Sequence, residues 1–223
     1  EMNDHIKSLL INAPPSHEIP FEVLQDIRRK GGGLLESQPY SEKAENRLIN
    51  QDKNKVTIRI FNNDSPNFVY LHIHGGGHCI GAADMQDQSL EKISNDLNCV
   101  VVSVEYRLAP ANPYPAAPDD CEAAAIWLIE NSKSQFNTEK IVIGGESAGA
   151  NLSAVTLQRL KSKGLLDNVK GANLIYGSYD ARLTPSTLKQ QGSDEIFLLS
   201  YEMIRKFRDS YFQGTLALSL PDI

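Results

Sequence analysis

The sequence predicts an α/β protein in which a mostly parallel sheet is wrapped by helices on both faces. Three observations carry this prediction. Apolar runs of strand length alternate along the chain with stretches whose apolar residues recur at helical spacing. The run at 99–104 is almost continuously apolar, as expected of a strand that is buried on both faces of a parallel sheet. Two glycine-rich motifs directly follow such runs, so both fall at the carboxyl ends of strands, where reaction loops lie.

The chain of 223 residues is long enough for one domain with a sizeable core. Residues 1–47 are polar and broken by proline and glycine, with one helix expected at 22–30. Strict alternation at 56–61 predicts a half-buried strand. Ser200 is expected to cap a last helix that runs through Phe212. The other strands are expected at 68–73, 99–104, 140–144 and 172–176, and the other helices at 85–97, 119–130 and 148–161.

The run IVIGGESAG at 141–149 predicts a strand, a sharp turn and the start of a helix. A serine on such a turn sits in a strained backbone, and its hydroxyl stands clear of the sheet. Gly145 and Gly149 are expected where strand and helix approach too closely for side chains. The helix that follows directs its N-terminal N–H groups toward the serine oxygen. Ser147 is therefore the candidate nucleophile, and the alternative is an ordinary glycine-rich turn.

A second motif, HGGG at 74–77, follows the apolar run at 68–73. Three glycines after a strand free several backbone N–H groups to point one way. Donors placed in this manner stabilise the negative charge that develops on a carbonyl oxygen under attack. The alternative is a flexible glycine turn that binds no ligand.

Two further motifs, YRLAP at 106–110 and PYPAAP at 113–118, lie between these two. The ordered set resembles the hormone-sensitive-lipase-like branch of the α/β-hydrolases, and the resemblance covers residues 68–176. It implies an α/β-hydrolase fold and a carboxylesterase that hydrolyses small acyl esters through an acyl-enzyme on Ser147.

The resemblance also assigns roles by motif position. The backbone N–H groups of Gly76, Gly77 and Ala148 would form the oxyanion hole, while His74 and Gly75 would shape its loop. Residues 1–47 would form a helical cap, to which residues 178–214 contribute, above a hydrolase core at 48–223. A loosely docked N-terminus is the alternative to such a cap. No metal or organic cofactor is implied.

The sequence departs from the family pattern at two positions. His78 stands where the family carries an aromatic residue, and Glu146 stands where it often has Asp. We expect Glu146 to pack or hydrogen-bond beside the sharp turn that carries Ser147 instead of reacting. His72 and His74 alternate along one strand, which makes a metal pair geometrically conceivable, but no further ligand is evident nearby. A backbone hydrogen bond from His74 to its loop is favoured instead.

The catalytic set is incomplete in this sequence. A serine needs a base, and in α/β-hydrolases the acid and then the histidine follow the serine along the chain. All five histidines precede Ser147, so Asp180, Asp194 and Asp209 have no histidine to orient. Three explanations stay open: a sheet truncated after its sixth strand, a base supplied by a partner chain, or a pseudoenzyme. The competing function is small-molecule binding on the same fold.

Composition limits the partners. A net charge of −6, with a tight basic cluster only at 28–30, argues against nucleic acid, and that cluster is expected at a solvated helix end. Arg107 is expected to hold its loop through a salt bridge rather than to bind a substrate carboxylate. A sheet ending near Tyr176 would leave an apolar edge, which predicts homo-oligomerisation by edge pairing.

Three cysteines, Cys79, Cys99 and Cys121, show no metal-site spacing and are expected to be buried free thiols. Free thiols are typical of a reducing compartment, so a cytoplasmic location is expected, and a signal peptide upstream of Glu1 is the alternative that stays open. No apolar run is long enough for a membrane span, and no signal-peptide core follows Glu1.

Overall fold

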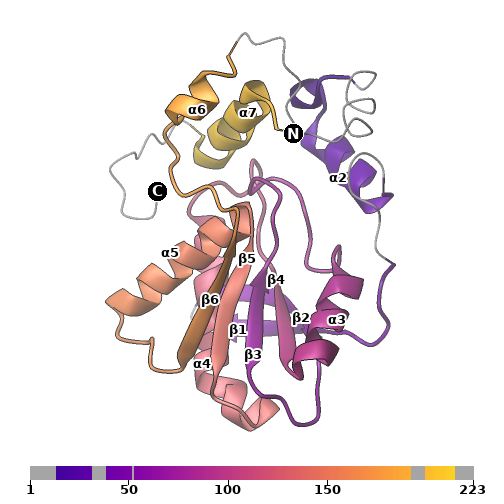
Figure 1. Ribbon diagram of the computed structural model, residues 1–223, viewed down its shortest axis with the longest axis vertical. Coiled ribbons are helices and arrows are strands. Elements are labelled where there is room, and N and C mark those ends of the chain that lie inside the picture. Colours follow the sequence, from indigo (N-terminus) through magenta and orange to yellow (C-terminus); the bar gives the residue numbers. More distant parts are fainter. Residues whose placement is uncertain (1–13, 32–38, 52, 192–198, 214–223) are drawn as a thin grey trace.

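The computed structural model describes residues 14–31, 39–51, 53–191 and 199–213, and in them six strands form one sheet in the order β1-β2-β4-β3-β5-β6 (Figure 1). The pairs β1–β2 and β2–β4 are antiparallel, whereas β4–β3, β3–β5 and β5–β6 are parallel. The predicted mostly parallel sheet is therefore confirmed. The strands are β1 (Glu45–Gln51), β2 (Asn54–Phe61), β3 (Val69–Ile73), β4 (Val100–Glu105), β5 (Ile141–Glu146) and β6 (Val169–Ile175).

Helices cover both faces of this sheet. Helices α4 (Ala116–Phe136) and α5 (Ala148–Ser162) pack on each other and on one face, where the larger hydrophobic core lies. Helix α3 (Asp87–Leu97) packs on β2 and β4, where a smaller core gathers around Tyr70 and Leu90. Parallel strands between two helical layers lose both faces to the interior, which explains why β3 and most of β4 are buried throughout.

Strand β1 was not predicted, and its first three residues fall in the segment assigned above to the N-terminus. Its sequence is polar, and in β1 only Ile49 is buried. The strand exists because it pairs with β2 over its whole length, from Glu45 opposite Ile60 to Gln51 opposite Asn54. Backbone pairing at a sheet edge needs no apolar pattern, so periodicity could not reveal it.

The prediction that 56–61 is half-buried is wrong. Ile58, Ile60 and Phe61 are buried, and so is Arg59, whose side chain would have marked a solvent face. The guanidinium of Arg59 is neutralised by Asp87 at the start of α3 and donates to the Tyr40 hydroxyl at 3.0 Å. A buried cation is tolerated when it is paired and fully hydrogen-bonded. Helix α3, which packs on β2, supplies that partner as Asp87.

The helices differ from expectation mainly at their ends. Helix α4 extends beyond the predicted range of 119–130 at both ends. It can begin before Pro118 because a proline in the first turn costs no intrahelical N–H bond. A short helix, α6 (Pro185–Leu188), was not predicted. The predicted last helix is confirmed as α7 (Tyr201–Phe212), and the Ser200 hydroxyl accepts from the Met203 N–H at 3.2 Å.

The N-terminal elements and α7 lie together beyond the carboxyl ends of the parallel strands (Figure 1). These elements are the 3₁₀ turn η1 (Ser16–Glu18) and helix α2 (Phe21–Arg29), which matches the helix predicted at 22–30. The rings of Phe21 and Phe207 stack with centroids 5.5 Å apart, and Lys206 donates to the carbonyl of Ile19. Segments at opposite ends of the described chain are thus in direct contact.

Strand β6 is the last strand of the described sheet, as predicted. It pairs only with β5, and its side chains from Lys170 onward are exposed. Leu174, Ile175 and Tyr176 are exposed by 40%, 41% and 76%. The predicted apolar edge is therefore present.

In the parts of the chain that the structure describes, none of the helices combines the length and apolar character that a membrane crossing requires.

Candidate active site

Ser147 occupies the sharp turn between β5 and α5. Its backbone has φ 55° and ψ −120°, a conformation that non-glycine residues rarely adopt, so the predicted strain is confirmed. The turn is held because the Ser147 N–H donates to the carbonyl of Ile175 at 2.9 Å. A Cβ at Gly145 or at Gly149 would lie 1.9 Å from the carbonyl oxygen of Ile73 on β3. Only glycine therefore fits at positions 145 and 149, because this turn packs directly against the backbone of β3.

The glycine loop after β3 lies beside this turn. The Gly75 N–H is already used, since it donates to Glu146 Oε1 at 2.6 Å. The N–H groups of Gly76 and Gly77 donate to no described residue, and neither does that of Ala148, which opens α5. Gly77 has φ +59°, and a Cβ there would lie 2.4 Å from the Phe207 ring. Unused N–H donors beside a serine are what an oxyanion hole requires.

Glu146 ties the loop to the sheet. Its Oε1 also accepts from Gln86 at 2.6 Å, and its Oε2 lies 3.2 Å from His72 Nε2. The other ring nitrogen of His72 lies 3.0 Å from the Ser103 hydroxyl. Burial alone would raise the pKa of the Glu146 carboxyl, but its hydrogen bonds and the His72 ring lower it to about 2. The prediction that Glu146 hydrogen-bonds beside the elbow is confirmed.

His74 is a loop residue, as expected. Its Nδ1 lies 2.9 Å from the carbonyl of Gly75, and its ring stacks on Tyr106 at 4.1 Å. Burial lowers the pKa of His74 to about 3, so the ring is neutral at pH 7. In the described residues no cluster of three or more metal-ligating side chains occurs, and His72 and His74 have separate partners. The donors of this region do not fit a metal centre.

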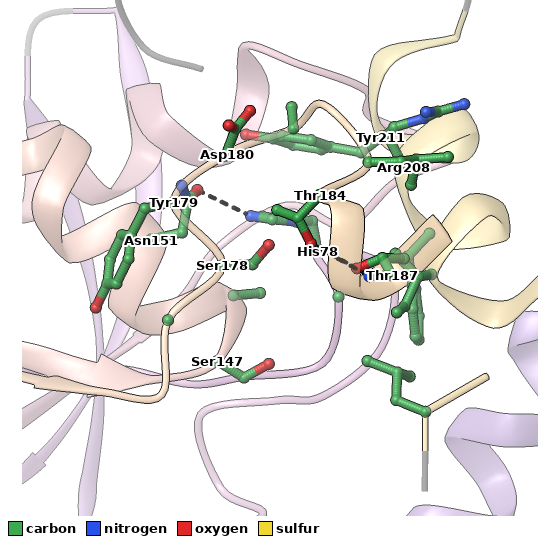
Figure 2. Close-up of a pocket in the computed structure, with 18 of the residues that line it drawn as sticks. His78, Ser147, Asn151, Ser178, Tyr179, Asp180, Thr184, Thr187, Arg208 and Tyr211 are labelled. Carbon is green, nitrogen blue, oxygen red and sulfur yellow. Dashed lines mark hydrogen bonds between the residues drawn. The ribbon is translucent and has the colours of Figure 1, made fainter. Parts of the chain in front are cut away.

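A cavity of about 500 Å³ opens above Ser147 (Figure 2). One wall comes from the side of Ser147, with Gly77, His78 and Asn151. The opposite wall comes from the chain after β6 and from α7, with Phe207 and Tyr211 among the aromatic residues. A cavity of this size accommodates a small ester.

His78 faces this cavity. It has φ 63°, its ring stacks on Tyr211 at 4.0 Å, and its Nε2 lies 3.3 Å from Asn151 Oδ1. Burial lowers the pKa of His78 to about 4, so this ring too is neutral at pH 7.

Among the described residues, no histidine hydrogen-bonds to the Ser147 hydroxyl; the hydrogen bonds of His72, His74 and His78 go to other groups. Asp180 lines the cavity but pairs with Arg182 at 2.8 Å. Asp209 pairs with Arg208 at 2.7 Å, and Asp194 lies outside the described residues. The structure thus brings together the predicted serine and the glycine loop but adds no base.

Two secondary predictions hold. Arg107 forms a two-pronged salt bridge with Asp120, in which Nε donates to Oδ2 at 2.9 Å and Nη2 donates to Oδ1 at 2.8 Å, and this pair anchors its loop to α4. All three cysteines are free and buried, and burial raises the pKa of Cys79 to about 12 and that of Cys99 to about 11. Thiols with such pKa values are unreactive at neutral pH.

Local sequence patterns do not reveal the residues that complete the cavity. Phe207 and Tyr211 fall inside the predicted last helix, where nothing in the sequence marks them as lining a cavity. Asn151 carried a usable signal, because it lies four residues after Ser147, on the same side of helix α5. The part played by α7 had no local signal, because it depends on packing between distant segments.

The chain is similar in sequence to known α/β-hydrolases and esterases. The α/β-hydrolase fold family matches residues 70–221. The esterase LipI of Mycobacterium tuberculosis is 39% identical over 97 residues, which are 43% of this chain and 30% of that protein. An arylesterase of Saccharolobus solfataricus is 35% identical over 139 residues, which are 59% of this chain and 45% of that protein. The chain thus spans less than half the length of these curated relatives.

A solved structure supports the fold. A hyperthermophilic esterase from Pyrobaculum calidifontis superposes with a TM-score of 0.82 at 24% identity, covering 98% of this chain and 72% of that one. The likeness at this identity concerns the fold alone. With the elbow, the glycine loop and the family match together, the chain belongs to the α/β-hydrolase fold family, in its hormone-sensitive-lipase-like branch of esterases and lipases.

Proposed function

We propose that this protein is a carboxylesterase that hydrolyses small acyl esters through an acyl-enzyme on Ser147. The observation that carries the proposal is the strained elbow, which holds the Ser147 hydroxyl at the floor of a cavity of ester size. The unpaired N–H groups beside it support the same reading. The relatives named esterase add to this support.

In the proposed reaction, Ser147 Oγ attacks the ester carbonyl carbon while a base removes the hydroxyl proton. The negative charge that develops on the carbonyl oxygen is stabilised by the N–H groups of Gly76, Gly77 and Ala148. The alcohol leaves with a proton, and water then hydrolyses the acyl-enzyme. Gly75 takes no direct part, since its N–H is bonded to Glu146.

The base and its orienting acid are the open part of the proposal. The family implies a histidine held by an acid, and no described residue fills either role. Without triad members, an oxyanion hole and substrate binding still accelerate hydrolysis by roughly 10³–10⁴ over water. That residual rate falls far short of a working esterase.

The second candidate is binding of small molecules in the same cavity without turnover. The specific observation that favours it is the Ser147 hydroxyl, to which no described histidine bonds. In either case the protein binds a small organic molecule. We also propose that the protein is cytoplasmic.

Intact-mass measurement after incubation with an organophosphonate ester tests the proposal. We expect one adduct per chain, and none in Ser147→Ala. Labelling of the parent alone means that a base reaches Ser147 and activates it. An unlabelled parent would reject the esterase in favour of the binding protein.

We propose in addition that the exposed edge of β6 pairs with a second copy of the chain. The support is the row of exposed apolar side chains at its end, Leu174, Ile175 and Tyr176.

A further inference from the structure

Helix α2 binds the chain just after the glycine loop through the side chain of Gln25. The Gln25 Nε2 donates to the carbonyl of Gly81 at 2.9 Å, and the Gly81 N–H donates to Gln25 Oε1 at 2.6 Å. One end of this amide donates and the other accepts, so a flipped amide would break both bonds. The orientation of the Gln25 side chain is therefore fixed by the backbone that it binds.

Gly81 lies against the beginning of the same loop. It has φ +106°, and a Cβ there would stand 2.5 Å from the Gly75 carbonyl oxygen, so this close approach requires glycine. Within the loop, the Ile80 N–H donates to the carbonyl of Gly76 at 3.0 Å. The loop thus closes on itself, and Gln25 holds its far end.

The near end of the loop has a separate anchor on β5, where the Gly75 N–H donates to Glu146 Oε1 at 2.6 Å. Between the two anchors lie Gly76 and Gly77, whose N–H groups are the proposed oxyanion donors. Both have positive φ, 132° and 59°, and glycine has more backbone freedom than any other residue. The direction of these N–H groups therefore depends on what holds the loop at each end.

A second residue of α2 lies against the loop itself. A Cβ at Gly76 would stand 3.1 Å from Arg28 Nη1, and Arg28 follows Gln25 by three positions, on the same side of the helix. Arg29 has a different partner, since its Nη1 donates to Asp84 at 2.9 Å, and among the described residues it has no hydrogen bond to the glycine loop. Neighbouring positions of α2 thus anchor different parts of the chain.

We propose that Gln25 is a positioning residue for the oxyanion hole. By holding Gly81, it keeps the N–H groups of Gly76 and Gly77 directed at the carbonyl oxygen under attack. This inference rests on the proposed function, since it assigns a role in the same reaction to helix α2. Oxyanion donors act from about 3 Å, and a misplacement of about 1 Å can cost a hundredfold in rate. Docking of α2 and alignment of the donors are therefore coupled.

The rate at which Ser147 reacts with ethyl p-nitrophenyl butylphosphonate tests the inference. In this reaction Ser147 Oγ forms a bond to phosphorus, p-nitrophenolate leaves, and the base takes the hydroxyl proton. The phosphoryl oxygen then occupies the place of the carbonyl oxygen at the donors. Release of p-nitrophenolate, followed at several phosphonate concentrations, gives a limiting rate constant and a half-saturating concentration. The first depends on the oxyanion donors, and the second depends on binding in the cavity.

We expect Gln25→Met, which keeps the length of the side chain and removes both hydrogen bonds, to lower the limiting rate constant about tenfold. The half-saturating concentration should stay within about twofold of the parent value, because the cavity lining does not include Gln25. Gln25→Glu keeps the acceptor and loses the donor, so its loss should be smaller. Arg29→Met is the matched control, since it removes the bond from the same helix to Asp84, and it should react as the parent does.

A limiting rate constant in Gln25→Met equal to that of the parent would overturn this inference and leave the proposed function standing. An equal loss in Arg29→Met would overturn it as well, because general docking of α2 would then be the cause. If the parent itself does not react, the proposed function fails, and backbone NMR order parameters of Gly76 and Gly77 decide the inference. It is overturned unless Gln25→Met lowers them and Arg29→Met does not.

Discussion

Strands β5 and β6 are parallel neighbours at the cavity, yet they are built differently. In β5, Ile141 and Ile143 are fully buried between β3 and the helical layers. In β6, Leu174 and Ile175 remain exposed by about 40%. The Ser147 side of the cavity is therefore held by buried backbone and core contacts. The opposite wall is held by local pairs such as Asp180 with Arg182 and by the packing of α7.

The contrast in burial between β5 and β6 shows which side of the cavity is held in place by the core. Ser147 and the glycine loop at 74–77 lie on the side with buried contacts, where the Glu146 carboxylate and the Ile73 carbonyl leave them little room. The chain after β6 shapes the rest of the cavity. In the proposed esterase, preorganisation of the reacting groups would depend on the first side and substrate selection on the second.

The largest expected difference in stability is between two Gly→Ala variants, one on β5 and one on β6. Gly145→Ala places a Cβ 1.9 Å from the Ile73 carbonyl oxygen, which must displace backbone, so we expect a loss of more than about 4 kcal/mol. Gly171→Ala on β6 meets only Val142 Cγ2 at 4.0 Å, and should change stability by less than about 1 kcal/mol. Urea unfolding measures both. Equal losses would contradict the proposed contrast between the two strands.

A pair of truncations probes the same contrast in the side chains. Ile143→Ala removes a fully buried side chain from β5 and should cost about 3 kcal/mol. Leu174→Ala removes a half-exposed one from β6 and should cost less than about 1 kcal/mol. Chemical denaturation at fixed pH compares them. A costly Leu174→Ala would mean that β6 is covered in solution.

A third change tests the loop histidine through pH. Burial holds the pKa of His74 near 3, below the usual value of about 6.5 in the unfolded chain. The unfolded chain therefore binds the extra proton first, so this contribution to stability is complete above pH 6.5 and is lost as pH falls toward 3.

His74→Phe should accordingly reduce the stability lost between pH 7 and pH 5 by about 2 kcal/mol. The phenyl ring can keep the stack on Tyr106, and it removes the buried Nε2, which has no partner among the described residues. Urea midpoints at the two pH values measure the effect. Parallel pH slopes in parent and variant would show that His74 is not buried as a neutral ring.

The smallest effect on stability is expected at the β6 edge, where Leu174→Lys should change the free energy of unfolding by less than about 0.5 kcal/mol. A lysine on an edge opposes pairing between copies, so it should lower self-association of the chain. Sedimentation velocity at micromolar concentration compares the two proteins. A parent that sediments as a monomer would rule out the proposed edge pairing.

The local parts of the site were predictable from the sequence. Strand, turn and helix at 141–149 follow from apolar periodicity and from the glycines around Ser147, and the HGGG loop follows from its place after a strand. These features depend on neighbours a few residues apart, so a local pattern contains them. The same holds for the Ser200 cap, whose partner lies three residues away.

The tertiary structure alone decided the rest, because contacts between distant residues leave no periodic trace. Cys79 and Phe207 meet across 128 positions, and that packing of α7 against the glycine loop forms the far wall of the cavity. Arg59 could be buried only because α3 supplies Asp87. His78 was visible as a departure from the family, but its contact with Asn151 depends on the loop after β3 meeting the first turns of α5. The sequence by itself determined the turn that carries Ser147, and the fold decided what surrounds it.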